Sequence, residues 1–154
     1  MTIQQESTEL GTQRHDAAHW LDADQQRIWR TFLLASARIS QHLDEDLRSH
    51  GLDLGEYEIL VALEESEGHR ARMSELAETV HQSRSRLTHT IARMERRGLV
   101  TRTSCPSDRR GVWAQLLTAG LDLLTRAAPS HVAAVRAVFV DVVDPADFTA
   151  LGRA

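Results

Sequence analysis

The chain contains no lysine, and all 18 of its basic residues are arginine. Against 22 acidic residues they leave a formal net charge of −4, which by itself does not predict a nucleic-acid partner. A single cysteine, Cys105, excludes an intramolecular disulfide framework and fits a reducing compartment. No apolar run approaches the roughly 18–20 residues that cross a bilayer, and the N-terminus lacks a signal-peptide pattern. We therefore expect a soluble cytoplasmic protein with no membrane contact.

The distribution of charge along the chain favours an anionic partner, although the net charge does not. Residues 70–110 hold ten arginines against four acidic residues, a surplus of six positive charges. The rest of the chain holds eight arginines against 18 acidic residues, a surplus of ten negative charges. A basic segment on an acidic scaffold is typical of a protein that presents one face to an anionic partner such as DNA.

Apolar spacing and turn residues predict a mostly helical chain with a small two- to three-stranded β-wing. Helices are expected over residues 22–49, 53–65, 74–81, 83–98 and 118–143, with a last one after Asp144. Ser74, Ser83, Thr118 and Asp144 are the expected N-caps. Strands are expected over 99–104 and 112–117, on either side of a turn over 106–111.

This order predicts a winged helix-turn-helix fold on a helical dimerisation scaffold. We expect a flexible arm over 1–18 and a single domain over 19–154. Within that domain the winged helix-turn-helix takes residues 53–118, and the dimerisation helices take 20–50 and 119–154.

The helix expected over 83–98 has the pattern of a DNA recognition helix. Leu87, Ile91 and Met94 fall on one side and should pack in the core. The opposite side is basic and holds no acidic residue, so its first turns are suited to base edges and phosphates. Arg86 can form a bidentate pair with guanine. The expected DNA contacts from this helix are Ser83, Arg84, Ser85, Arg86, Thr88, His89 and Arg93.

The expected wing carries positive charge near the tip of its hairpin, where an anionic partner such as DNA would contact it. Arg109 and Arg110 stand near the hairpin tip, and a narrow minor groove attracts inserted arginine. Asp108 would repel phosphate, so its expected role is to hold an arginine fork in place by a bidentate pair.

A dimer is expected because one winged helix contacts few base pairs, whereas two related by a two-fold axis read half-sites one turn apart. The helix expected over 118–143 also has more apolar surface than a small domain can cover. The expected partners are therefore a second copy of the chain and double-stranded DNA with an inverted-repeat operator.

Several segments of the chain resemble the MarR family of transcriptional regulators. They are RMSELAETVHQSRSRLT over 72–88, RMERRGLV over 93–100, DRRG over 108–111 and LTAG over 117–120. The chain also resembles an actinobacterial subset of that family at Pro129-x-His131-Val132 and at Trp29-x-x-Phe32. The resemblance covers residues 20–154 and implies a homodimeric repressor released by a small, often phenolic or aromatic-acid, ligand. It also implies that Arg110 enters the minor groove while Asp108 orients it.

The ligand site that the resemblance implies has only weak support in the residues themselves. Candidate effector-pocket residues are Arg30, Arg38, His42, Tyr57 and His131. Each has a simpler interpretation, because the arginines can be solvated and the rings can be packed interface residues.

Other function classes find less support in the sequence. The helical i, i+4 pair His15 and His19 can chelate a metal, but no second histidine pair accompanies it, so we expect no metal site and no cofactor. Cys105 near arginines can act in redox sensing. No nucleophile–base pair or phosphate-binding glycine loop is present, so we expect no enzymatic activity. A metal-responsive, oxidant-responsive or effector-independent regulator of the same fold is the alternative.

Overall fold

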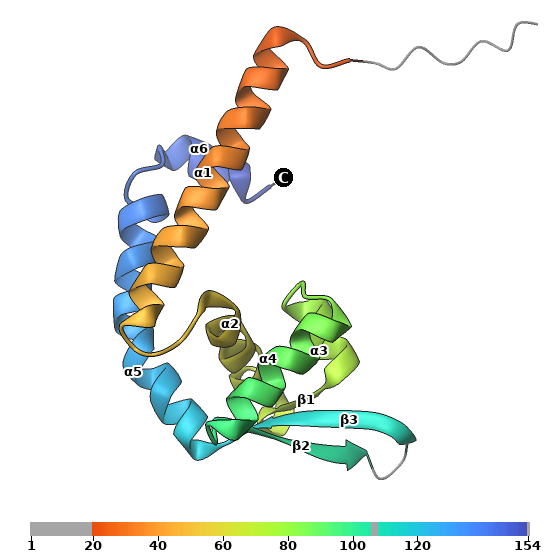
Figure 1. Ribbon diagram of the computed structural model, residues 1–154. Helices are drawn as coiled ribbons and strands as arrows, with labels where there is room; N and C mark the ends of the chain where they lie inside the picture. Colours follow the sequence, from red (N-terminus) through yellow and green to blue (C-terminus); the bar gives the residue numbers. More distant parts are fainter. Residues whose placement is uncertain (1–19, 106–107, 154) are drawn as a thin grey trace, which may run out of the picture. The chain divides into compact units, whose positions relative to one another are not determined.

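The computed structural model describes residues 20–105 and 108–153, with the side chains of 108–110 outside that description (Figure 1). The first helices are α1 (Ala23–Arg48), α2 (Leu54–Glu64), α3 (Met73–Thr79) and α4 (Arg84–Arg96). A 3₁₀ turn η1 (Glu67–His69) precedes α3. The strands are β1 (Arg70–Arg72), β2 (Val100–Cys105) and β3 (Asp108–Leu116). They are followed by α5 (Thr118–Val135), a π-helical turn η2 (Arg136–Val140) and α6 (Pro145–Leu151).

The chain divides into two compact units at Leu34, within α1. The second unit, from Ala35 onward, contains the remainder of α1 and every later element. The arm expected over 1–18 lies outside the described residues. No helix in the described part of the chain combines the length and apolarity that a membrane crossing requires.

Two of the four predicted helix caps are confirmed. Ser83 Oγ accepts a hydrogen bond from Arg86 N at 3.3 Å, and Asp144 Oδ1 accepts one from Ala146 N at 2.8 Å. The predictions for Ser74 and Thr118 are wrong, because each residue already lies inside its helix. In both cases the cap position falls at or directly after the end of a strand. Arg72 ends β1, and Leu117 still donates a backbone hydrogen bond to Leu99 O at 3.0 Å.

The three strands form one antiparallel sheet in the order β1-β3-β2. The turn predicted over 106–111 is too long, because β3 begins at Asp108, which is paired with Cys105 beyond a register shift at Ser104/Cys105. Asp108, Arg109 and Arg110 therefore lie on a strand of the wing and not in its turn.

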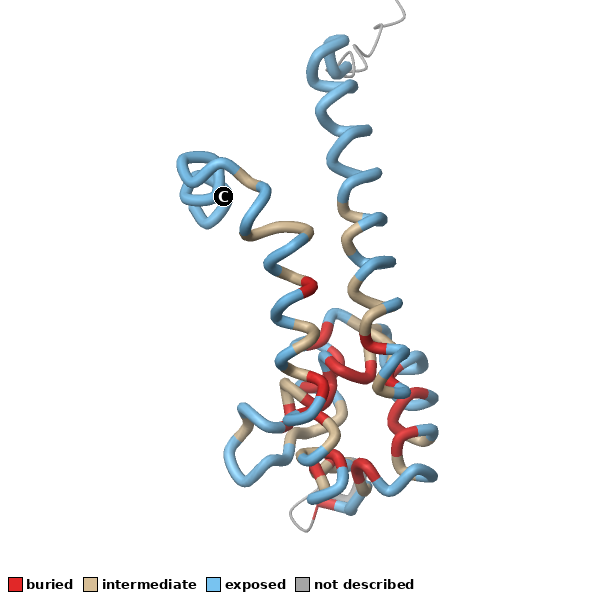
Figure 2. Tube along the Cα trace, turned by 90° about the vertical axis from the view of Figure 1, so that its left-hand side faces the viewer, coloured by how far each residue is buried: buried red, intermediate tan, exposed pale blue. Residues whose placement is uncertain are grey.

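The core lies among α2, α3, α4 and the sheet, and the end of α1 and part of α5 close it (Figure 1). Its fully buried large side chains are Leu47, Leu52, Ile59, Leu60, Leu63, Leu76, Leu87, Ile91, Met94 and Val100. Each such side chain contributes about 1.5–3 kcal/mol relative to an exposed one. Buried positions gather in this part of the chain, whereas α6 has none (Figure 2). This core is what holds α4 in a fixed orientation.

Candidate nucleic-acid interface

Helix α4 is anchored in the core along one face and exposed along the opposite one. Leu87, Ile91 and Met94 are fully buried, as the sequence predicts. On the outward face Ser85, His89 and Arg96 are exposed. Arg96 makes no hydrogen bond or ion pair with any described residue, so its charge is presented to solvent. A 13-residue helix held in this way has the dimensions of a major-groove reader.

The two flanks of α4 face different neighbours. Arg84, Thr88 and Glu95 lie on the flank toward the wing, and Glu95 is bonded there to Arg102 of β2. Helical spacing puts Arg86, Arg93 and Arg97 together on the other flank, toward α2. The two flanks therefore place the predicted DNA contacts in unlike surroundings, although Arg84, Arg86 and Thr88 are all exposed.

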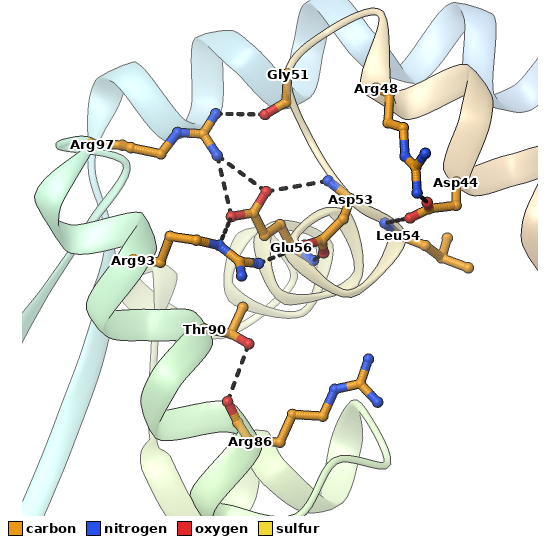
Figure 3. Close-up of polar contacts among 10 residues, drawn as sticks. All are labelled: Asp44, Arg48, Gly51, Asp53, Leu54, Glu56, Arg86, Thr90, Arg93 and Arg97. Atoms are coloured by element: carbon orange, nitrogen blue, oxygen red, sulfur yellow. Dashed lines mark hydrogen bonds and ion pairs between the residues drawn. The ribbon is translucent and has the colours of Figure 1, made fainter.

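The α2-facing flank holds an ionic cluster around Glu56, which we call the Glu56 cluster (Figure 3). The Glu56 side chain is only 3% exposed. Its Oε1 accepts from Arg93 Nε at 2.9 Å, and its Oε2 accepts from Arg97 Nη1 at 3.1 Å. Arg93 Nη2 also donates to Asp53, and Arg97 Nη2 donates to Gly51 O at 2.7 Å. Five residues from the α1–α2 loop, α2 and α4 are thereby joined.

The sequence explains only part of the Glu56 cluster. Asp53 and Glu56 form a capping box at the start of α2, in which Asp53 Oδ1 accepts from Glu56 N at 2.8 Å and Glu56 Oε2 accepts from Asp53 N at 3.2 Å. The hydrogen bond to Glu56 raises the pKa of Arg93 above its already high ordinary value. Arg93, expected to contact DNA, is therefore held as a cation against two carboxylates.

The wing is tied to α4 by a second carboxylate. Glu95 Oε1 accepts from the backbone N of Arg102 at 2.9 Å, and its Oε2 accepts from Arg102 Nε at 2.9 Å. These hydrogen bonds hold the pKa of Glu95 below its ordinary value. The predicted roles of the Asp108, Arg109 and Arg110 side chains lie outside the described residues.

A stack on the exposed sheet face was not predicted. The guanidinium carbons of Arg70 and Arg72 lie 5.1 and 5.4 Å from the ring centroid of Trp113. Arg72 Nη2 also donates to the buried Cys105 Sγ at 3.6 Å. The alternation of arginines at 70 and 72 was the available signal, since strand β1 pairs Arg72 directly with Trp113.

A cleft of about 1080 Å³ lies beside α4, between the C-terminal part of α1, α2, the end of α3 and α5. It brings together two of the predicted effector residues, Tyr57 and His131, whose ring centroids are 4.2 Å apart. Arg38 and His42 are exposed on α1 and are not among the residues that line it. Arg30 belongs to the other compact unit.

Burial shifts the pKa values of titratable groups that line this cleft. Burial raises the pKa of Tyr57 and lowers that of His131, against which Asp46 acts in the opposite direction. Burial also raises the pKa of Glu58, and the charges of Arg86 and His81 partly oppose that shift. The buried Gln82 Oε1 and His131 Nδ1 lack a hydrogen-bond partner among the described residues. The cleft thus brings together two tilted rings and two buried polar atoms that have no hydrogen-bond partner among the described residues.

Metal-binding geometry is not found in the described part of the chain, where no group of three or more His, Cys, Asp or Glu side chains could hold an ion. The predicted pair His15 and His19 lies outside the described residues.

Comparison with known proteins gives a consistent result. A family model described as "MarR family" matches residues 50–111. The solved structure of AbsC, a MarR family transcriptional regulator from Streptomyces coelicolor, is 48% identical, with coverage of 87% of this chain and 90% of that one and a TM-score of 0.83. Sco3205 from the same organism, a MarR family regulator solved in complex with DNA, is 42% identical, with coverage of 90% and 87% and a TM-score of 0.86. The HTH-type transcriptional repressor YetL from Bacillus subtilis is 24% identical over 80% of this chain and 74% of its own.

Proposed function

The chain belongs to the MarR family of DNA-binding transcriptional regulators, and we propose that it is a homodimeric repressor that a small molecule releases from an inverted-repeat operator. One observation carries the proposal. Helix α4 is fixed by Leu87, Ile91 and Met94 while Ser85, His89 and Arg96 project outward beside a wing whose sequence adds Arg109 and Arg110. This is the arrangement that reads a major groove and the adjoining minor groove.

The proposed contacts divide by role. Ser85, Arg86 and His89 contact base edges, because they lie in the first turns of α4. Ser83, Arg84 and Thr88 hold phosphates, together with Arg96 on the outward face. On the wing Arg109 and Arg110 enter the minor groove and Asp108 orients them. The similarity to Sco3205, which was solved with DNA, supports this assignment. Arg93 is left out because Asp53 and Glu56 engage its guanidinium.

The proposed dimer contact is formed by a second copy of the chain. In the first compact unit Trp29 and Phe32 stack at 6.0 Å between centroids and are 51% and 57% exposed. In the second, Val142 on the segment after α5 and Phe148 on α6 are also exposed, at 66% and 42%. Aromatic and aliphatic side chains of this size are seldom left in water unless a partner covers them. We assign both sets to the homodimer contact that joins two α4 helices on one operator.

The proposed effector site is the cleft beside α4. A planar aromatic acid fits its chemistry, because Tyr57 and His131 supply aromatic rings and Arg86 supplies positive charge. Arg86 also lines the cleft, so a ligand there would compete with DNA for one of the proposed base contacts. Release of DNA by the ligand follows from that shared residue.

The experiment that tests the proposal combines binding with release. Fluorescence anisotropy would follow the purified protein on its own upstream intergenic DNA, with scrambled DNA as competitor and a panel of phenolic acids added. We expect specific binding that one class of compound reverses. Specific binding that no compound disturbs would contradict the effector proposal and favour metal, oxidant or effector-independent control.

A further inference from the structure

The arginines of the α4 region differ in whether an acidic side chain of the protein binds them. Five of them, at positions 84, 86, 93, 96 and 97, lie on α4 or directly after it. Arg96 has no ion-pair partner among the described residues, whereas Arg93 and Arg97 are both bonded to Glu56 (Figure 3). We propose that Glu56 sets the affinity and the salt dependence of DNA binding by keeping these two guanidinium groups away from the DNA phosphates. The inference rests on the proposed function.

The geometry makes Glu56 a fixed anchor. Both carboxylate oxygens are occupied, Oε1 by Arg93 and Arg97 and Oε2 by Arg97 and the backbone N of Asp53. The last of these contacts belongs to the capping box of α2, which prevents the carboxylate from following an arginine that moves outward. Arg97 is also held by Gly51 O.

Burial makes the release of either arginine unfavourable. The Glu56 side chain is 3% exposed, and a buried carboxylate that loses its cationic partner is left uncompensated in a medium of low dielectric constant. A phosphate would therefore have to replace an ion pair that the protein already satisfies. Asp53 adds a second anionic contact to Arg93 and strengthens this hold.

The consequence for DNA binding follows from the nature of phosphate contacts. Each neutralised phosphate adds about 0.9 to the magnitude of the slope of log K against log salt for B-DNA, whatever the base sequence. Two more phosphate contacts would raise affinity for every sequence alike and make binding more sensitive to salt, without changing the ratio of specific to non-specific binding. By holding Arg93 and Arg97, Glu56 limits this sequence-independent part of the binding free energy. Glu56 acts here as a positioning residue, through the two arginines.

The direct test is the Glu56→Gln variant, measured by anisotropy over a salt series on upstream and on scrambled DNA. Glutamine has nearly the same shape and retains an acceptor for the Asp53 backbone N but removes the charge. We expect the slope to steepen by up to about two units on upstream and on scrambled DNA alike, with the specificity ratio unchanged. The triple variant Glu56→Gln, Arg93→Gln, Arg97→Gln should return to the wild-type slope. A Glu56→Gln slope equal to wild type on both DNAs would overturn the inference.

A matched pair of single variants keeps the test valid even if Glu56→Gln does not fold. Arg93→Gln should leave the salt slope unchanged on both DNAs, whereas Arg96→Gln, three residues away on the exposed face, should lower its magnitude by about one. A loss of about one unit in Arg93→Gln would contradict the inference. If wild type itself shows no preference for upstream DNA, the proposed function fails instead, so the two failures are distinguishable.

Discussion

Glu95, in the last turn of α4, accepts hydrogen bonds from both the backbone N and the Nε of Arg102 on β2, each at 2.9 Å. The recognition helix and the wing are thereby joined through one carboxylate. Because the two elements are proposed to enter neighbouring grooves, this contact fixes the angle between the two halves of the DNA-binding surface. The pH dependence of stability is a direct way to detect it.

Glu95→Gln should remove part of the acid sensitivity of folding. The contacts with Arg102 lower the pKa of Glu95, so its stabilising contribution is complete above the ordinary value of 4.5 and is lost as pH falls through the lowered folded pKa. Urea unfolding of wild type and variant over a pH series measures this. The wild-type advantage should shrink as pH falls below 4.5, and a constant difference at every pH would argue against the assignment.

His131→Phe should remove a second pH-dependent contribution, in a higher range. Burial lowers the pKa of His131, so the wild type is most stable above the ordinary value of 6.5 and loses stability as pH falls below it. Phenylalanine retains a ring against Tyr57 but does not titrate. Between about pH 7.5 and about pH 5.5 the variant should lose less unfolding free energy than wild type. Parallel pH profiles would show that His131 does not contribute.

Gly120→Ala should destabilise the junction between β3 and α5. A Cβ at this position would lie 2.3 Å from Leu99 O and 2.8 Å from Leu116 Cδ1, so the backbone itself would have to move. We expect a loss of about 1–3 kcal/mol in unfolding free energy, the range for overpacking. Gly152→Ala is the matched control, because its Cβ would meet no atom closer than 3.7 Å, and it should change stability by less than about 0.5 kcal/mol.

Arg110→Ala tests the proposed role of the wing. A minor-groove arginine that reads charge and groove width should contribute to binding on every sequence, so the affinity should fall on upstream and on scrambled DNA alike. The magnitude of the salt slope should fall by about one. Arg153→Ala, an exposed residue beyond α6, serves as the control and should bind as wild type does. Unchanged binding by Arg110→Ala would contradict the wing assignment.

Much of the fold could be predicted because its signals are local. The apolar spacing of residues 22–49 gives α1 to within a residue at each end, and Ser83 marks the start of α4 correctly. The predictions failed where a strand preceded a helix. At Ser74 and Thr118 the helix begins earlier than the side-chain pattern indicates, because Arg72 at the end of β1 and Leu117, bonded to Leu99 O, already take the cap positions.

The candidate site was less accessible to sequence reasoning, for a physical reason. A helical projection puts Arg93 on the polar side of α4 but gives no information about which neighbour that side faces. Asp53 and Glu56, which engage Arg93, belong to another helix and are brought there by packing of the core. The same projection placed Arg93 and Arg96 on one polar face and could not separate them, although Arg93 is ion-paired and Arg96 has no ion-pair partner among the described residues.

Hydroxyl-radical footprinting on the upstream intergenic DNA tests the central claim most directly. Two copies of α4 and its wing on one two-fold axis should protect two half-sites in an inverted repeat, with centres about 10–10.5 base pairs apart. Each half-site should show backbone protection on both sides of one major groove, flanked by minor-groove protection from the wing. One isolated protected patch, or protection that spreads evenly over unrelated sequence, would contradict a dimeric, sequence-specific regulator.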